Sequence, residues 1–184
     1  MTTALALDGL PMTDDEFAAI GETSERIEFF DGSLHVTPNP SLGHQRISRR
    51  VANALDAGAE AAGLAVYEAI SLTLAPGRIP IPDIAVISDM GRETLFVPGS
   101  QVRLVSEILS PSNAATDRVL KMHYYAVAGI PWYLLIDPEN RALHLNRLVG
   151  EAYIEVSVTK VGDVLRLTEP LAAVLDPEEL LPPW

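Results

Sequence analysis

Apolar residues repeat at helical intervals over one long stretch of the chain. The stretch runs from about Leu42 to Ala62, and Gly63 follows it directly. This spacing predicts an amphipathic helix that ends at the glycine. The residues expected on its inward face are Ile47, Val51, Ala54, Leu55 and Ala62.

Two further helices are indicated by residues that cap helix ends. Thr13 and Glu16 form a capping-box pattern, which predicts a short helix starting directly after Thr13. A longer helix is expected over about 114–128, with Ser112 or Asn113 as its N-cap.

Shorter apolar segments predict strands. The segments 26–30 and 33–37 flank Asp31-Gly32, and an Asp-Gly turn between apolar segments predicts a β-hairpin. Further strands are expected over 64–74 with a bend near Ser71, and over 83–88, 102–109, 132–136 and 142–148, with weaker ones at 153–158 and 164–167.

The order of these elements predicts the fold class. Both faces of the segment 102–109 are largely apolar towards its end, which indicates a central strand covered on both sides. From about residue 42 to residue 136 the order is helix, three strands, helix, strand. We therefore expect an α/β (α+β) fold, a mixed central sheet flanked by helices, with additional N- and C-terminal strands. A length of 184 residues suits a single domain, 1–184.

Composition excludes several classes of protein. The chain has no cysteine, so disulfides and zinc sites built on thiolates are excluded. No apolar run reaches the roughly 18 residues that a membrane span needs. Residues 1–10 lack a basic start and a long apolar run, which is not the pattern of a secretory signal. We therefore expect a cytoplasmic protein.

The net charge of −12 is unfavourable for a protein that binds nucleic acid, because phosphate contacts use Lys and Arg. The excess acids lie near the two ends, however. Residues 1–31 hold eight acids and one base, and residues 151–184 hold seven acids and two bases. Residues 32–150 hold ten of each. The middle of the chain is therefore neutral, which permits DNA binding without predicting it.

Two carboxylates in apolar surroundings are the first candidates for chemistry. Glu107 lies within the apolar run 104–109, where an unpaired carboxylate is costly to bury or takes up a proton. Asp83 opens the apolar segment that comes one strand earlier. Carboxylates on neighbouring strands can together hold a hard cation such as Mg²⁺ or Mn²⁺. The alternatives are a structural ion pair or exposed face for Glu107 and a turn residue for Asp83.

Lys121 is a third candidate, because lysine is rare in this chain. There are two lysines and eleven arginines, and an amine can transfer a proton whereas a guanidinium cannot. Tyr125 lies on the same side of the predicted helix as Lys121. Asp117 precedes Lys121 by four residues, so a solvated ion pair between the two is the alternative.

Five more residues have a weaker claim to a role. Glu28 is an isolated carboxylate on a predicted strand, and His44 lies on the inward face of the long predicted helix. Each is either a structural residue or a supporting residue near the metal. Arg46, Arg49 and Arg50 form a small basic cluster on that helix, which is either a solvated face or a phosphate contact.

Taken together, these motifs resemble the Uma-type putative restriction endonucleases, a bacterial branch of the PD-(D/E)XK nuclease superfamily. The resemblance covers roughly residues 14–148. The matching residues, in order, are 26–32, His44, Pro82-Asp83, 107–112, Asp117-Arg118, Lys121, Tyr125 and 129–133. The resemblance implies a restriction-endonuclease-like core over about 42–136.

The resemblance also implies a mechanism. Asp83 and Glu107 would hold Mg²⁺ (or Mn²⁺), and Lys121 would orient or deprotonate the attacking water and stabilise the developing charge. The superfamily places its lysine two residues after the acid, but Leu109 stands there, so the amine is expected to come from the following helix. Supporting roles are implied for Glu28, His44, Asp117 and Tyr125, and Glu28 and His44 would complete the metal shell or position the substrate.

The function implied in this way is metal-dependent hydrolysis of phosphodiester bonds in DNA. A homodimer is expected from the fold alone. Two alternatives stay open at this point. One is a non-catalytic binding or assembly module with a nuclease fold, and the other is a metal-dependent hydrolase of another phosphate ester.

Overall fold

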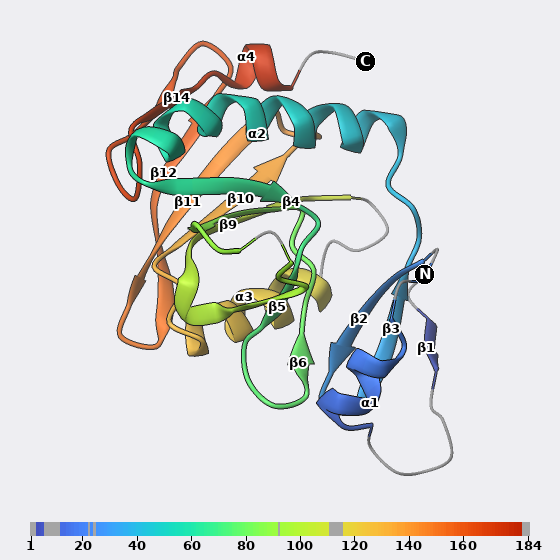
Figure 1. Ribbon diagram of the computed structural model, residues 1–184. Helices are drawn as coiled ribbons and strands as arrows, with labels where there is room; N and C mark the ends of the chain where they lie inside the picture. Colours follow the sequence, from blue (N-terminus) through green and yellow to red (C-terminus); the bar gives the residue numbers. More distant parts are fainter. Residues whose placement is uncertain are drawn as a thin grey trace.

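A six-stranded mixed sheet lies at the centre of the protein (Figure 1). The structure is a computed structural model that describes residues 3–5, 12–21, 23, 25–91, 93–110 and 116–181. The strand order is β12-β11-β10-β9-β7-β4. The strands are β4 (Leu64–Glu68), β7 (Ile84–Ser88), β9 (Val102–Ile108), β10 (Trp132–Asp137), β11 (Ala142–Val149) and β12 (Ala152–Lys160).

The two long helices cover opposite faces of this sheet. β9 and β10 are parallel, and helix α3 (Thr116–Val127) makes the crossover between them. The other neighbouring strands are antiparallel. Helix α2 (Leu42–Ala61) lies above the sheet and α3 below it (Figure 1). The predicted fold class, a mixed sheet between helices, is therefore confirmed.

Helix α2 buries one face against the sheet, as its apolar spacing predicts. Ser41 caps its first turn, and the residues that it buries are Ile47, Ser48, Val51, Leu55 and Ala59. The expectation for Ala62 is wrong. The helix ends at Ala61, so Ala62 is turned out into solvent instead of following the buried face.

A second, four-stranded sheet lies beside the central one and carries α1 (Asp14–Ala19) (Figure 1). Its strand order is β1-β3-β2-β6. The strands are β1 (Thr3–Leu5), β2 (Arg26–Phe30), β3 (Ser33–Thr37) and β6 (Arg78–Ile79). The predicted hairpin of β2 and β3 is present, and Asp31 and Gly32 both have positive φ, as a tight Asp-Gly turn requires. The capping box at Thr13 is also formed.

The segment expected as one strand over 64–74 is in fact two strands. The chain leaves the central sheet after β4, and Ala69 has a positive φ of 53°. It then forms β5 (Ser71–Thr73), which pairs in parallel with β8 (Phe96–Pro98). A short 3₁₀ helix, Gly99–Gln101, leads from β8 into β9. The bend therefore comes at Ala69, slightly before the expected Ser71.

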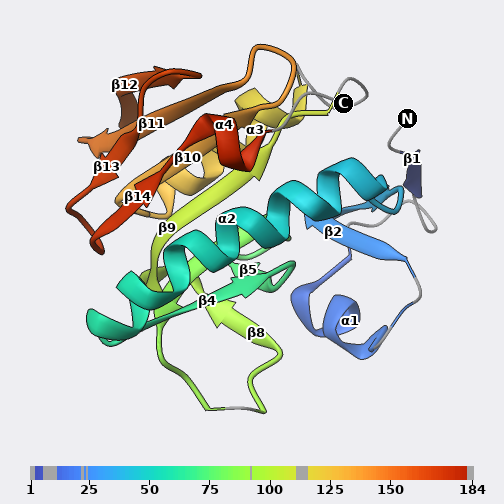
Figure 2. The same cartoon turned by 90° about the horizontal axis from the view of Figure 1, so that it is seen from above.

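The C-terminal part of the chain packs against α2 (Figure 2). β13 (Leu165–Leu167) and β14 (Ala173–Leu175) form a hairpin, and α4 (Pro177–Leu180) follows. Leucines from these elements complete the apolar cluster on the α2 side of the sheet. Ser112 and Asn113, the expected caps of α3, lie outside the described residues. In the part of the chain that is described, no helix is long and apolar enough to cross a membrane.

Gly58 allows this close packing, which gives a first testable expectation. A Cβ at Gly58 would lie 2.1 Å from the carbonyl oxygen of Ala172. Gly58→Ala should therefore lower the free energy of unfolding by about 1–3 kcal/mol, although alanine normally stabilises an exposed helix interior by about 1 kcal/mol over glycine. Urea denaturation followed by circular dichroism measures this change. Ala57 is exposed, so Ala57→Gly measures the difference in helix propensity between alanine and glycine alone. A Gly58→Ala protein that is more stable than the wild type would contradict the close packing.

Ser106 gives a second expectation, because its hydroxyl is buried in apolar surroundings. Among the described residues its Oγ has no hydrogen-bond partner. Ser106→Ala should raise the free energy of unfolding by about 0.5–2 kcal/mol, because an unsatisfied buried hydroxyl is removed. The matched control is Ser48→Ala, since the Ser48 hydroxyl donates to Glu68 Oε1 at 2.6 Å. That variant should be destabilised, and equal effects in both proteins would refute the assignment.

Candidate active site

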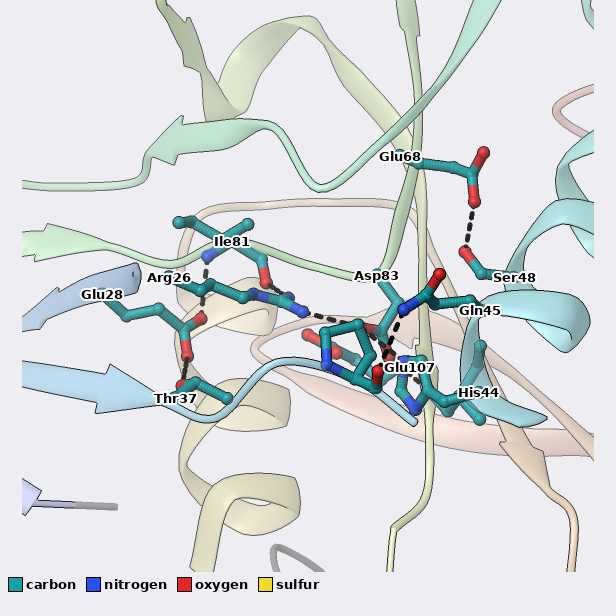
Figure 3. Close-up of polar contacts among 12 residues, drawn as sticks. Arg26, Glu28, Thr37, His44, Gln45, Ser48, Glu68, Ile81, Asp83 and Glu107 are labelled. Atoms are coloured by element: carbon teal, nitrogen blue, oxygen red, sulfur yellow. Dashed lines mark hydrogen bonds and ion pairs between the residues drawn. The ribbon is translucent and has the colours of Figure 1, made fainter. Parts of the chain in front are cut away.

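Asp83 and Glu107 meet at one edge of the central sheet. Asp83 directly precedes β7, and Glu107 lies near the end of β9. β7 and β9 are antiparallel, so the start of one lies beside the end of the other, and Ile84 pairs with Ser106. The next position along the two strands brings Asp83 and Glu107 together (Figure 3).

Asp83 is held by donors from three different elements. Its Oδ1 lies 3.0 Å from Arg26 Nη1 and 3.1 Å from His44 Nε2. Its Oδ2 accepts the backbone N–H of Ile108 at 2.8 Å. Burial by itself would raise the pKa of Asp83, but the hydrogen bond to His44 and the charge of Arg26 outweigh burial and hold that pKa well below its usual range. Asp83 is therefore a fixed carboxylate anion.

Lys121 reaches the carboxylates from the first half of α3. Its Nζ lies 2.8 Å from Glu28 Oε1 and 3.4 Å from Glu107 Oε1. Burial would lower the pKa of Lys121, but the charges of Glu107 and Glu28 outweigh it and raise that pKa above the ordinary lysine range. Tyr125, one turn further along, donates its hydroxyl to Glu107 Oε1 at 2.7 Å. Both α3 side chains therefore point at Glu107.

Glu28 is the most deeply buried acid of the group, with 2% of its surface exposed. Besides Lys121, its Oε1 accepts the backbone N–H of Ile81 at 2.8 Å. Its Oε2 accepts the hydroxyl of Thr37 at 3.2 Å (Figure 3). Glu28 belongs to β2, so the hairpin sheet contributes directly to the site.

Arg26 is a residue of the site that the sequence analysis did not single out by itself. It lies two positions before Glu28, on the same face of β2, and it donates to the carbonyl of Ile81 as well as to Asp83 (Figure 3). The sequence does hold one signal for Arg26: a spacing of two residues on a strand places its side chain on the same face as Glu28. Arg26 and Glu28 both bind the backbone of Ile81, so they fix the segment that leads into Asp83.

A second contact joins the hairpin to α3. The hydroxyl of Tyr124 donates to Asp31 Oδ2, and Arg78 Nε lies 2.9 Å from Asp31 Oδ1. The Arg78 guanidinium also lies over the Tyr124 ring, 4.3 Å from its centroid. Because Tyr124 follows Lys121 by three residues, this contact fixes the rotation of α3 that points Lys121 at the carboxylates.

The remaining candidate residues lie elsewhere. Asp117 belongs to α3, but its side chain lies outside the described part of the structure. Arg46 and Arg49 are exposed on α2. Arg50 donates to the backbone carbonyl of Glu179 in α4, so it has a structural contact.

The inner cluster of the site is short of positive charge. Three carboxylates, those of Glu28, Asp83 and Glu107, face the two permanent cations Arg26 and Lys121. The shortage appears at Glu107, where burial raises the pKa to about 7 even though the charge of Lys121 lowers it. A bound cation would supply the missing charge.

The donor set can be compared with the needs of a metal. Among the described residues, no group of three or more His, Cys, Asp or Glu side chains is arranged to hold an ion. Mg²⁺ does not need such a cage, because it is usually held by one or two carboxylates together with water and substrate phosphate. The carboxylate oxygens of Asp83 and Glu107, in a cluster that lacks a positive charge, are therefore of the kind that Mg²⁺ and Mn²⁺ prefer.

Comparisons with known proteins agree with this fold. The family model for Uma2, described as putative restriction endonuclease, matches residues 14–178. A solved structure described as a putative nuclease belonging to DUF820, from Anabaena variabilis ATCC 29413, superimposes with a TM-score of 0.74 at 20% sequence identity. The match covers 93% of this chain and 98% of that one. A search of curated proteins found no match.

Proposed function

Because the chain belongs to the Uma2 family of putative restriction endonucleases, we propose that it is a metal-dependent endonuclease that hydrolyses phosphodiester bonds of DNA. The observation that carries the proposal is the convergence of Asp83, Glu107 and Lys121 from two strands and a helix. Buried carboxylates beside a buried amine are costly for a purely structural core, and a catalytic role accounts for their presence.

Asp83 and Glu107 are the proposed metal ligands. A bound divalent cation would polarise the scissile phosphate and lower the pKa of a coordinated water. Arg26 and His44 keep Asp83 ionised and oriented towards the site. The Lys121 amine lies 2.8 Å from the buried carboxylate of Glu28, and this ion pair favours the charged ammonium. A charged ammonium can orient the water and stabilise the developing phosphate charge, but it cannot take up a proton. We therefore favour the first two roles for Lys121 over deprotonation of the water.

Contacts to the rest of the substrate are proposed on the first turns of α2. His44 lies in the first of these turns, and the exposed Arg46 and Arg49 follow on the same helix. Both arginines are exposed residues, and a nucleic-acid backbone that approaches the carboxylates from this end of the helix would pass close to them. A homodimer stays a prediction.

A nuclease screen tests the proposed function. Purified protein is incubated with supercoiled, linear and single-stranded DNA and with RNA, in Mg²⁺, Mn²⁺ or EDTA. We expect cation-dependent cleavage of DNA, and none by the Asp83→Asn protein prepared in parallel. Equal cleavage by both proteins would reveal a contaminant. No cleavage together with no Mn²⁺ binding would leave the cluster a structural ion network and overturn the proposal. Cleavage of RNA alone would change the proposed substrate from DNA to another phosphate ester.

A further inference from the structure

The amine of Lys121 lies between two carboxylates that differ in their other partners. It is closer to Glu28, at 2.8 Å, than to Glu107, at 3.4 Å. The other contacts of Glu28 are neutral groups, the N–H of Ile81 and the hydroxyl of Thr37. Among the hydrogen-bonding contacts described for Glu28, Lys121 is therefore the one charged partner, while Arg26 interacts with Glu28 electrostatically without a direct contact.

Glu28 is also placed as a fixed counter-ion. Its side chain is 3% exposed, and both of its carboxylate oxygens accept hydrogen bonds from the protein. An ionised carboxylate in this setting is costly to bury unless a positive charge lies beside it. Glu107 is more open, with 13% of its side chain exposed. The geometry thus pairs Lys121 with Glu28 and leaves Glu107 the more accessible of the two acids.

We propose that Glu28 is the counter-ion reserved for Lys121, and that it keeps the ammonium from competing with the divalent cation for Glu107. The proposal rests on the proposed function above. Glu28 then serves as a positioning residue and does not bind the metal. The metal ligands are Asp83 and Glu107 alone.

The consequence can be derived from the charges. Without the negative charge of Glu28, the Lys121 ammonium has Glu107 as its closest remaining carboxylate partner. A cation must then displace the ammonium from Glu107 and also approach an uncompensated positive charge. Metal affinity should therefore fall when Glu28 is neutralised. It should recover when Lys121 is neutralised as well, because the competing charge has gone.

A double-mutant cycle on Mn²⁺ affinity tests this, with isothermal titration calorimetry as the measurement. Glu28→Gln keeps the shape of the side chain, and we expect Mn²⁺ to bind about tenfold more weakly. The Glu28→Gln/Lys121→Met protein should return to within about threefold of the wild type. The control Thr37→Val removes a neutral donor to Glu28 and should leave the affinity within about threefold. If the double variant binds as weakly as Glu28→Gln, Glu28 is a ligand and the proposal is wrong.

A measurement on the wild-type chain covers the case in which Glu28→Gln does not fold. The chain has two lysines, Lys121 and Lys160, so ¹⁵N-lysine labelling gives two Nζ resonances. The exposed Lys160 is the internal reference for fast exchange. We expect the protected Lys121 ammonium resonance to persist at saturating Mg²⁺. Its loss on metal binding would overturn the counter-ion role. If the wild type binds neither Mg²⁺ nor Mn²⁺, the proposed function fails first, and this inference with it.

Discussion

Replacing Asp83 by asparagine should abolish Mn²⁺ binding and reduce cation-dependent cleavage by at least about 100-fold. The amide keeps the shape of the side chain and loses the negative charge that a hard cation requires. The loss should be large, because the hydrogen bond to His44 and the charge of Arg26 hold the pKa of Asp83 well below its usual range and keep it the anion of the site. Titration calorimetry with Mn²⁺ measures the binding, and plasmid cleavage measures the activity.

The matched control for this experiment is Asp89→Asn. Asp89 is exposed and follows the opposite end of the same strand, β7. It should bind Mn²⁺ and cleave DNA as the wild type does, which removes the general effect of one lost negative charge. Unchanged Mn²⁺ affinity in a folded Asp83→Asn protein would refute the metal site.

Replacing Lys121 by methionine should separate metal binding from turnover. Methionine is similar in length and lacks the charge, so Mn²⁺ should bind at least as tightly as in the wild type. Cleavage should fall by about 100- to 1,000-fold, the usual effect of removing one group that stabilises charge in the transition state. Rates at saturating Mn²⁺ give the measurement.

Lys160→Met is the control for Lys121→Met, because Lys160 is the other lysine of the chain and is exposed at the end of β12. Its cleavage rate should stay within about twofold of the wild-type rate. A Lys121→Met protein that binds Mn²⁺ and cleaves at the wild-type rate would remove Lys121 from the mechanism.

The parts of the fold that repeat a strong local pattern could be predicted from the sequence. The buried face of α2 follows from apolar spacing, and the β2–β3 hairpin follows from Asp31-Gly32. The family that the motifs indicate is confirmed. The division of residues 64–74 between β4 and β5 was only partly foreseen. The sharp turn falls on Ala69, a residue that gives no turn signal.

The short strands β6 and β8 have no counterpart among the strands expected from the sequence. β6 has two residues and β8 has three, which is too short for an alternating pattern to show. Both are held by pairing with distant segments, β6 with β2 and β8 with β5. Such elements come from tertiary contacts and carry no local signal of their own.

The candidate site was predictable in its members more than in their pairing. Asp83 and Glu107 are indicated by their apolar sequence surroundings, and Lys121 is indicated because the chain has only two lysines. The ion pair between Glu28 and Lys121 joins segments far apart in sequence, so no spacing could indicate it. Arg26 has no distinctive sequence signal of its own, because arginine is common at the start of a hairpin strand.

A crystal structure of the protein grown with Mn²⁺ tests the central claim most directly. Anomalous scattering identifies the metal without assumption about its place. We expect one peak bound by a carboxylate oxygen of Asp83 and one of Glu107, with the Lys121 amine still beside Glu28. A peak bound elsewhere, or no peak together with Lys121 turned towards solvent, would contradict the site.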